Sequence, residues 1–137
     1  MRVIVIVLAF AATLVLAAPA PAASTLRFFH SPSRNIDCVL TSDSARCDIR
    51  SHTFRAPPRP SFCDLEWGSV LSVGKTSRRG RFACVGDTAR DPKSPVLAYG
   101  KSLRVGSMRC VSRTDGVRCN NRRGHGFLLG RAVYRLF

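Results

Sequence analysis

Two short segments of the chain combine arginine, glycine and a further base: Arg78-Arg79-Gly80-Arg81 and Arg122-Arg123-Gly124-His125. A guanidinium group binds phosphate or carboxylate through two parallel hydrogen bonds. Glycine lacks a side chain and lets a ligand approach the backbone closely. The two segments therefore predict an anion-binding site, with binding candidates Arg78, Arg79, Arg81, Arg122, Arg123 and His125. The competing explanation is a solvated, arginine-rich turn that binds no ligand.

His52 and His125 suggest a catalytic alternative. They occur in similar contexts, H-T-F and H-G-F, each a few residues after the second cysteine of a repeated motif. A metal-free nuclease uses a histidine pair as general base and acid, with arginine stabilising the charge on the phosphorane. The competing explanation is that each histidine hydrogen-bonds nearby backbone, because nothing in the sequence brings the two together. We therefore prefer a binding role to an enzymatic one.

Other catalytic patterns are missing from the sequence. There is no G-x-S-x-G, no H-E-x-x-H and no phosphate-binding P-loop. Asp64 and Glu66 alternate onto one face of a strand and imitate a glycosidase pair, but this spacing is common by chance. No two cysteines have the short spacing of a zinc knuckle. The sequence thus predicts neither a metal nor a cofactor.

Six cysteines indicate three disulfides rather than free thiols. An even number of cysteines after a secretion signal is typical of a stapled extracellular domain. Several pairings are possible, and we expect the sequential one because two of the loops that it closes have the length of a hairpin. The expected pairs are Cys38–Cys47, Cys63–Cys84 and Cys110–Cys119.

The two outer cysteine pairs predict a repeated β-hairpin. If Cys38 lies opposite Cys47, residues 41–44 form a four-residue loop; in the second copy the loop is 113–116. The second loop ends at Gly116, which tolerates the positive φ that such loops usually need. Ser44 takes the corresponding place in the first copy, so we expect strain in that turn.

The remaining segments read as further short strands. Pro57, Pro58 and Pro60 mark an extended linker, and Trp67 is expected in the core. No window has a sustained helical period. The fold class is therefore all-β, an antiparallel sandwich or small barrel of about eight or nine strands. The strands are expected within residues 26–30, 35–40, 45–50, 65–73, 81–85, 96–99, 103–111 and 126–137, the last bent at Gly130.

The first 22 residues have the pattern of a secretory signal peptide. Arg2 precedes an apolar run from Val3 to Ala18, and A-P-A-P-A-A supplies an A-x-A cleavage pattern before Ala23. The alternative is an uncleaved anchor, but the run is shorter than the roughly 20 residues that a spanning helix needs. We expect residues 1–22 to be removed and residues 23–137 to form one domain, secreted or attached to the cell envelope, without a transmembrane segment.

The charge of the expected mature chain is strongly positive. Of 22 basic residues 21 remain without Arg2, against 8 acidic ones, a net charge of about +13. All the remaining bases except Lys75, Lys93 and Lys101 are arginine. This composition favours polyanions: anionic envelope polymers, membrane headgroups or extracellular nucleic acid. Codon usage is a competing explanation of the composition, and a secreted inhibitor or protein-interaction module is a further alternative function.

Several motifs resemble a family of uncharacterised secreted domains from actinobacteria. They are F-F-H-S-P-S-R-N-I-D-C, the Trp67-Gly68 pair, G-R-F-A-C-V-G-D-T, L-A-Y-G, C-V-S-R-T-D-G-V-R-C-N-N and G-H-G-F-L-L-G-R-A-V-Y-R-L-F. Arg34 stands where the family pattern has Gly, and Gly130 where it has Ser, so the local turns should differ. The resemblance implies export and a domain that spans nearly all of the mature chain, and it implies no activity.

Overall fold

The structure is a computed structural model that describes residues 17–18 and 25–137. The expected signal peptide lies outside the described residues, apart from positions 17 and 18. Within the described residues there is no helix, and hence none long and apolar enough to cross a membrane. Ten strands are present: β1 (Arg27–His30), β2 (Ile36–Leu40), β3 (Ser44–Ile49), β4 (Val70–Gly74), β5 (Arg81–Phe82), β6 (Ser102–Val105), β7 (Met108–Arg113), β8 (Gly116–Asn120), β9 (Gly126–Leu129) and β10 (Tyr134–Leu136).

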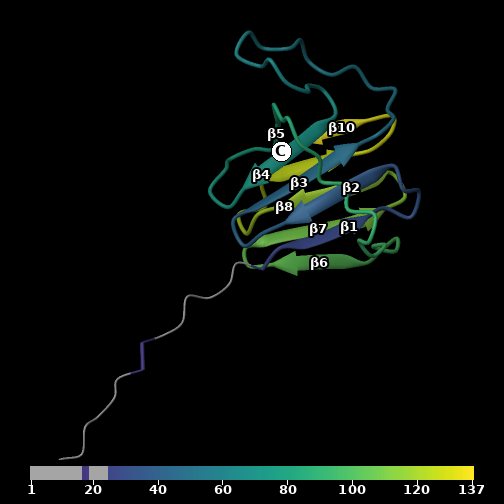
Figure 1. The fold of residues 1–137 in the computed structure, drawn as a ribbon. Coiled ribbons are helices and arrows are strands. Elements are labelled where there is room, and N and C mark those ends of the chain that lie inside the picture. Colours follow the sequence, from purple (N-terminus) through teal and green to yellow (C-terminus); the bar gives the residue numbers. More distant parts are fainter. Residues whose placement is uncertain (1–16, 19–24) are drawn as a thin grey trace, which may run out of the picture.

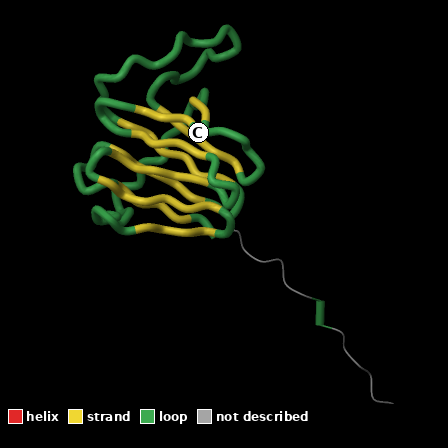
Figure 2. Tube along the Cα trace, turned by 180° about the vertical axis from the view of Figure 1, so that it is seen from behind, coloured by secondary structure: helices red, strands yellow, loops and turns green. Residues whose placement is uncertain are grey.

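The strands form two antiparallel sheets of five, each with its strands in chain order. β1 to β5 make the N-terminal sheet and β6 to β10 the C-terminal sheet (Figure 1). β3 packs on β7 and β8, and β4 packs on β9, so the two sheets lie face to face. Seen from behind, the described chain consists only of strands and loops (Figure 2). The predicted all-β sandwich is confirmed; it has ten strands rather than eight or nine and is not a closed barrel.

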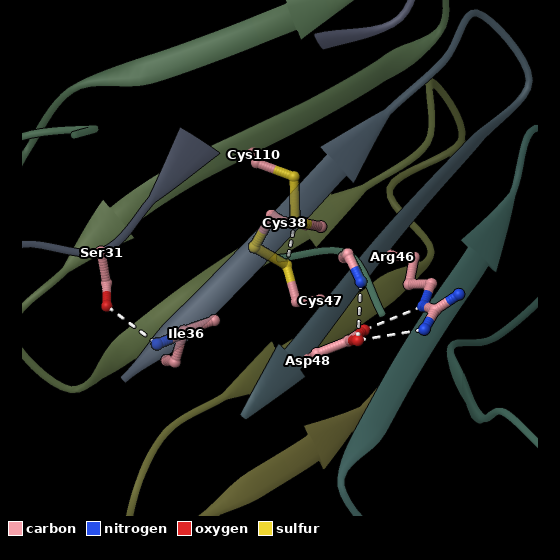
Figure 3. Close-up of a disulfide and its surroundings, with 9 residues drawn as sticks. Ser31, Ile36, Cys38, Arg46, Cys47, Asp48 and Cys110 are labelled. Carbon is pink, nitrogen blue, oxygen red and sulfur yellow. Dashed lines mark hydrogen bonds and ion pairs between the residues drawn. A yellow bond between two sulfur atoms is a disulfide. The ribbon is translucent and has the colours of Figure 1, made fainter. Parts of the chain in front are cut away.

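The three expected disulfides are all present, Cys38–Cys47, Cys63–Cys84 and Cys110–Cys119. The first and third staple the two repeated hairpins, β2–β3 and β7–β8. Their sulfurs meet between the sheets, with Cys47 Sγ 3.7 Å from Cys119 Sγ. Figure 3 shows the Cys38–Cys47 disulfide next to Cys110. The core is therefore built around two stacked disulfides, surrounded by the apolar side chains that alternate inward from both sheets.

The register of the two hairpins is largely as predicted. Cys38 faces Cys47 and Cys110 faces Cys119, each across one antiparallel ladder. The second ladder continues to Arg113 opposite Gly116, so its loop is Thr114-Asp115 and not the four residues expected. Gly116 does have a positive φ, 144°.

The expected strain at Ser44 is wrong. Arg34 is the single non-glycine residue with a positive φ among residues 25–137. The Thr41 hydroxyl accepts hydrogen bonds from the backbone N–H groups of Asp43 (3.2 Å) and Ser44 (3.0 Å). A side chain therefore closes the first turn, where a glycine closes the second.

Five expected strands divide or shrink. Residues 65–73 join the sheet only from Val70 onward, and residues 81–85 only as Arg81–Phe82, with a single bridge between Glu66 and Val85. Residues 103–111 form the hairpin β6–β7 with a turn at Gly106, whose φ is 54°. Residues 126–137 form β9 and β10 rather than one bent strand, because the chain reverses after Gly130. Val96 contributes only a single bridge, to His30.

Residues 50–69 connect β3 to β4 and extend beyond the sheets (Figure 1). Trp67 packs against the core, as expected, and its Nε1–H donates to the carbonyl oxygen of Pro57 at 2.9 Å. Cys63–Cys84 ties this loop to the segment after β5. The proline-rich stretch is thus held against the sandwich by a tryptophan and a disulfide.

Candidate functional site

The outer surface of the C-terminal sheet is rich in arginine. Cys110 and Cys119 point into the core, so strand alternation turns Arg109 and Arg118 outward. Arg104 lies directly opposite Arg109 in the ladder, and Arg135 lies two strands from Arg118 in the same row. We call Arg104, Arg109, Arg118 and Arg135 the arginine face. Arg118 is half-buried and the other three are exposed.

Within residues 25–137 no arginine of the arginine face forms an ion pair with a carboxylate; Arg135 acts on Asp115 only through its more distant charge. Asp115 is the only acidic residue after Asp91, and its Oδ1 accepts a hydrogen bond from Arg113 Nε at 2.9 Å. This hydrogen bond lowers the pKa of the Asp115 carboxyl below its ordinary value, so Asp115 is ionised at neutral pH. Two arginines directly opposite each other, like Arg104 and Arg109, destabilise a sheet, and a bound anion would relieve that repulsion.

The N-terminal sheet shows the opposite arrangement. Arg46 Nε donates to Asp48 Oδ1 at 2.8 Å, and Arg46 Nη1 donates to Asp87 Oδ1 at 2.6 Å (Figure 3 shows the Arg46–Asp48 pair). Arg50 Nε lies 3.1 Å from Asp37 Oδ2, whose carboxylate is buried. Arg46 and Arg50 are therefore neutralised by acidic neighbours, whereas the arginines of the arginine face, like Arg81 in β5, form no such ion pair among the described residues.

The structure brings the two predicted arginine segments together through Asn121. This buried side chain donates to the carbonyl oxygens of Gly74 (3.0 Å) and Ser77 (2.8 Å), just before the first segment. Its Oδ1 accepts from the backbone N–H groups of Arg123 (3.0 Å) and His125 (3.2 Å), within the second. The backbone of the first segment also meets the start of β9, where Gly80 N–H donates to Gly126 O at 3.0 Å.

One predicted residue, Arg79, joins the arginine face directly. Arg79, Arg118 and Arg135 line an open depression around Phe137. The Arg118 guanidinium carbon is 3.9 Å from the centre of the Phe137 ring, and Arg79 Nε donates to Leu136 O at 3.3 Å. Of the other predicted binding residues, Arg78, Arg81, Arg122 and Arg123 are exposed and His125 is half-buried. The predicted anion site and the arginine face are therefore neighbours.

The two candidate catalytic histidines lie at opposite ends of β9. His52 stacks on Phe54 with ring centres 3.9 Å apart, and the next residue, Thr53, donates its backbone N–H to Arg131 O, beyond the end of β9. His125 precedes β9, and a four-residue strand is roughly 13 Å long. The structure does not bring His52 and His125 together as an acid–base pair.

Two further groups of residues lack what a metal site or a catalytic acid needs. The sulfur atoms of Cys38, Cys47 and Cys119 lie within 4.8 Å of one another. Each is bonded in a disulfide, so none supplies the thiolate that a metal binds. Asp64 and Glu66 are both exposed on the loop that Cys63 anchors, outside the apolar pocket that a carboxylic acid needs to act as a general acid.

The arginine face itself was missed from the sequence. The sequence does indicate half of this face. Arg109 and Arg118 each precede a cysteine of the second hairpin, and strand alternation turns them to the side opposite the disulfide. Arg104 and Arg135 have no such signal. The pairing of β6 depends on an unexpected turn at Gly106, and the pairing of β10 on a chain reversal at Gly130, where the sequence predicts only a bend.

Comparison with known proteins identifies the family and nothing more specific. No curated protein and no solved structure matches the chain. A family profile described as a family of unknown function, DUF6636, matches residues 8–137. Three disulfides in so small a domain are typical of extracellular proteins. The chain belongs to DUF6636, a family of unknown function.

Proposed function

We propose that this protein is a non-catalytic binding module for an anionic polymer of the cell envelope or of the extracellular space. The observation that carries the proposal is the arginine face: four arginines on one sheet surface, without a carboxylate partner within residues 25–137. Arg79 and the converging arginine segments extend this surface beyond β10.

The shape of the arginine face suits a chain of charges better than a single ion. Arg104 lies on the outermost strand, β6, and Arg135 on the opposite outermost strand, β10. Neighbouring strands are about 4.8 Å apart, so the four arginines cross roughly 19 Å of sheet. One phosphate or carboxylate cannot contact both ends, whereas a polymer with regular negative charges can.

The compartment is part of the proposal. The disulfide-stapled core requires an oxidising environment, and the apolar segment with its A-x-A pattern predicts a signal peptide over residues 1–22. A secreted module meets envelope polysaccharides, lipid headgroups and released nucleic acid, all of which are polyanions.

The test is retention on heparin and on single-stranded DNA resins. Replacing Arg109, Arg118 and Arg135 with Gln should lower the salt concentration needed for elution, because three phosphate or sulfate contacts are lost. The matched control replaces three exposed bases elsewhere, Arg27, Arg55 and Lys93, with Gln. An equal decrease in both variants would show that only net charge matters, and a wild-type protein that neither resin retains would refute the proposal.

A protein-interaction module is the second candidate. Phe62 is 77% exposed and Leu65 is 52% exposed, on either side of the stapled Cys63. Exposed apolar side chains on a tethered loop are typical of a contact with another protein. A secreted enzyme that co-purifies with the protein, and is lost from a Phe62→Ser and Leu65→Ser variant that still binds polyanion resin, would favour this function.

A further inference from the structure

A polar cavity opens at the end of the sandwich where two turns meet. The β1–β2 turn and the β7–β8 turn supply most of its wall, and Tyr99 and Arg131 complete it. Its volume is about 380 Å³, within the roughly 300–1,000 Å³ of small-molecule sites. None of the residues first proposed for anion binding lines it, so it is a separate site.

Several hydrogen-bonding groups of the cavity have no partner among residues 25–137. The Tyr99 and Thr114 hydroxyls and the Arg131 guanidinium have no hydrogen-bond partner there. Arg113 and Asp115 form a parallel pair, Nε to Oδ1 at 2.9 Å and Nη2 to Oδ2 at 3.4 Å. This pair places carboxylate acceptors beside the guanidinium donors that remain free.

These groups match a sugar ring. Neighbouring hydroxyls of a sugar each donate and accept, so they fit a wall that alternates carboxylate oxygen and guanidinium N–H. The ring of Tyr99 is 49% exposed and offers an apolar surface to the C–H side of the sugar. Asp115 neutralises Arg113, which leaves Arg131 as the one uncompensated charge among the lining residues and suits a sugar with a single acidic substituent.

Arg113 links the cavity to the arginine face. It lines the cavity and lies opposite Gly116, two residues along β8 from Arg118. Residues two apart on a strand are about 7 Å apart on the same surface. A polymer with one ring in the cavity therefore continues past Arg113 onto Arg118.

We infer that this cavity binds one sugar ring of an acidic polysaccharide, and that the polymer held by the arginine face is such a polysaccharide rather than a nucleic acid. The inference rests on the proposed function. It rests independently on the cavity, whose Asp115 carboxylate accepts hydrogen bonds from sugar hydroxyls but repels a phosphate chain.

The experiment compares three polyanions of matched charge at one salt concentration: an octamer of galacturonate, an eight-charge polyphosphate and a single-stranded DNA with eight phosphates. The wild-type protein should bind the galacturonate at least tenfold more tightly than the other two. Tyr99→Ala should abolish this preference and leave the affinity for polyphosphate unchanged. Tyr99→Phe, which keeps the ring, should retain most of the preference.

The outcomes separate the two proposals. Binding of all three polyanions with equal affinity, or tighter binding of the DNA, would overturn the polysaccharide inference and leave the arginine face in place. A Tyr99→Ala variant that keeps the preference would equally remove the cavity from recognition. If none of the three binds, the proposed function itself fails.

Discussion

Ser112 has the one buried side-chain polar atom among the described residues that lacks a hydrogen-bond partner. It points into the core from β7, at the place that the buried Leu40 takes in the first hairpin. An unpaired buried hydroxyl costs about 1–3 kcal/mol of stability. An apolar side chain of similar size therefore suits this position better than serine.

Ser112→Ala is expected to raise the free energy of unfolding by about 1 kcal/mol, because it removes the unpaired hydroxyl. Urea denaturation measures the change. The control is Ser31→Ala, which should lower stability by about 1 kcal/mol, since Ser31 Oγ accepts a hydrogen bond from the Ile36 N–H at 3.1 Å. A destabilised Ser112→Ala would mean that the hydroxyl has a partner in solution.

Asn121 is the residue that joins the two arginine segments. Asn121→Ala removes four hydrogen bonds and leaves three backbone groups without a partner, since Gly74 O still accepts from the Ser77 N–H, and it should destabilise the protein by about 3 kcal/mol. The same variant should release the β8–β9 loop, and with it the arginine segments, for which faster amide exchange at Arg123 and His125 is the measurement. Asn120→Ala serves as the control, because Asn120 makes only one side-chain hydrogen bond, to the carbonyl oxygen of Asn121. Equal effects of the two substitutions would contradict the linking role of Asn121.

At the scale of elements, the repeated hairpin is the unit of the fold. Both copies carry cysteines directly opposite each other, nine positions apart, and the two disulfides pack sulfur to sulfur. The two turns use different chemistry for the same purpose: the Thr41 hydroxyl closes one and the positive φ of Gly116 the other. The hairpin is thus specified by its cysteine spacing more than by its turn residues.

Removing one hairpin disulfide should cost more stability than removing Cys63–Cys84, although it closes a shorter loop. The chain-entropy contribution is about 2.7 kcal/mol for Cys110–Cys119 and about 3.4 kcal/mol for Cys63–Cys84. Cys110 and Cys119 are completely buried, so replacing both with Ala also leaves a cavity in the core. We expect losses of about 4 and about 3 kcal/mol in chemical denaturation; a reversed order would show that loop length dominates.

At the scale of the whole molecule, charge is divided between the two sheets. Seven of the eight acidic residues precede residue 92, and several of them neutralise arginines on the N-terminal sheet. The C-terminal sheet has Asp115 alone. The N-terminal sheet therefore has arginines paired with carboxylates, whereas the four arginines of the arginine face have no such ion pair within residues 25–137.

The salt dependence of polyanion binding should show whether the arginine face makes the contacts. For single-stranded DNA, log affinity falls with log salt by about 0.7 for each phosphate contact. Replacing Arg109, Arg118 and Arg135 with Gln should therefore reduce the slope by about 2, and the Arg27, Arg55 and Lys93 control should leave it nearly unchanged. Fluorescence titration at several salt concentrations measures both slopes, and identical slopes would place the contacts elsewhere.

Local patterns in the chain determine much of this protein. The two nine-residue cysteine spacings predict the hairpin disulfides, and with them the register of both hairpins, because one pair of opposite residues determines every other pair in an antiparallel ladder. Cys63–Cys84 then follows as the remaining pair. Alternation predicts the all-β class. The repeated Arg-Arg-Gly segments predict the basic loops, although the loops form only one end of the basic surface.

Only the tertiary structure decides how these parts combine. The pairing of β6 with β7 places Arg104 opposite Arg109, and the pairing of β9 with β10 places Arg135 in the row of Arg118. A single buried Asn121 joins loops more than 40 positions apart. The sugar-sized cavity likewise depends on two turns from different sheets meeting at one end. The contacts of Asn121 and the cavity arise from packing between distant segments, and no local pattern of residue types encodes which distant segments will meet.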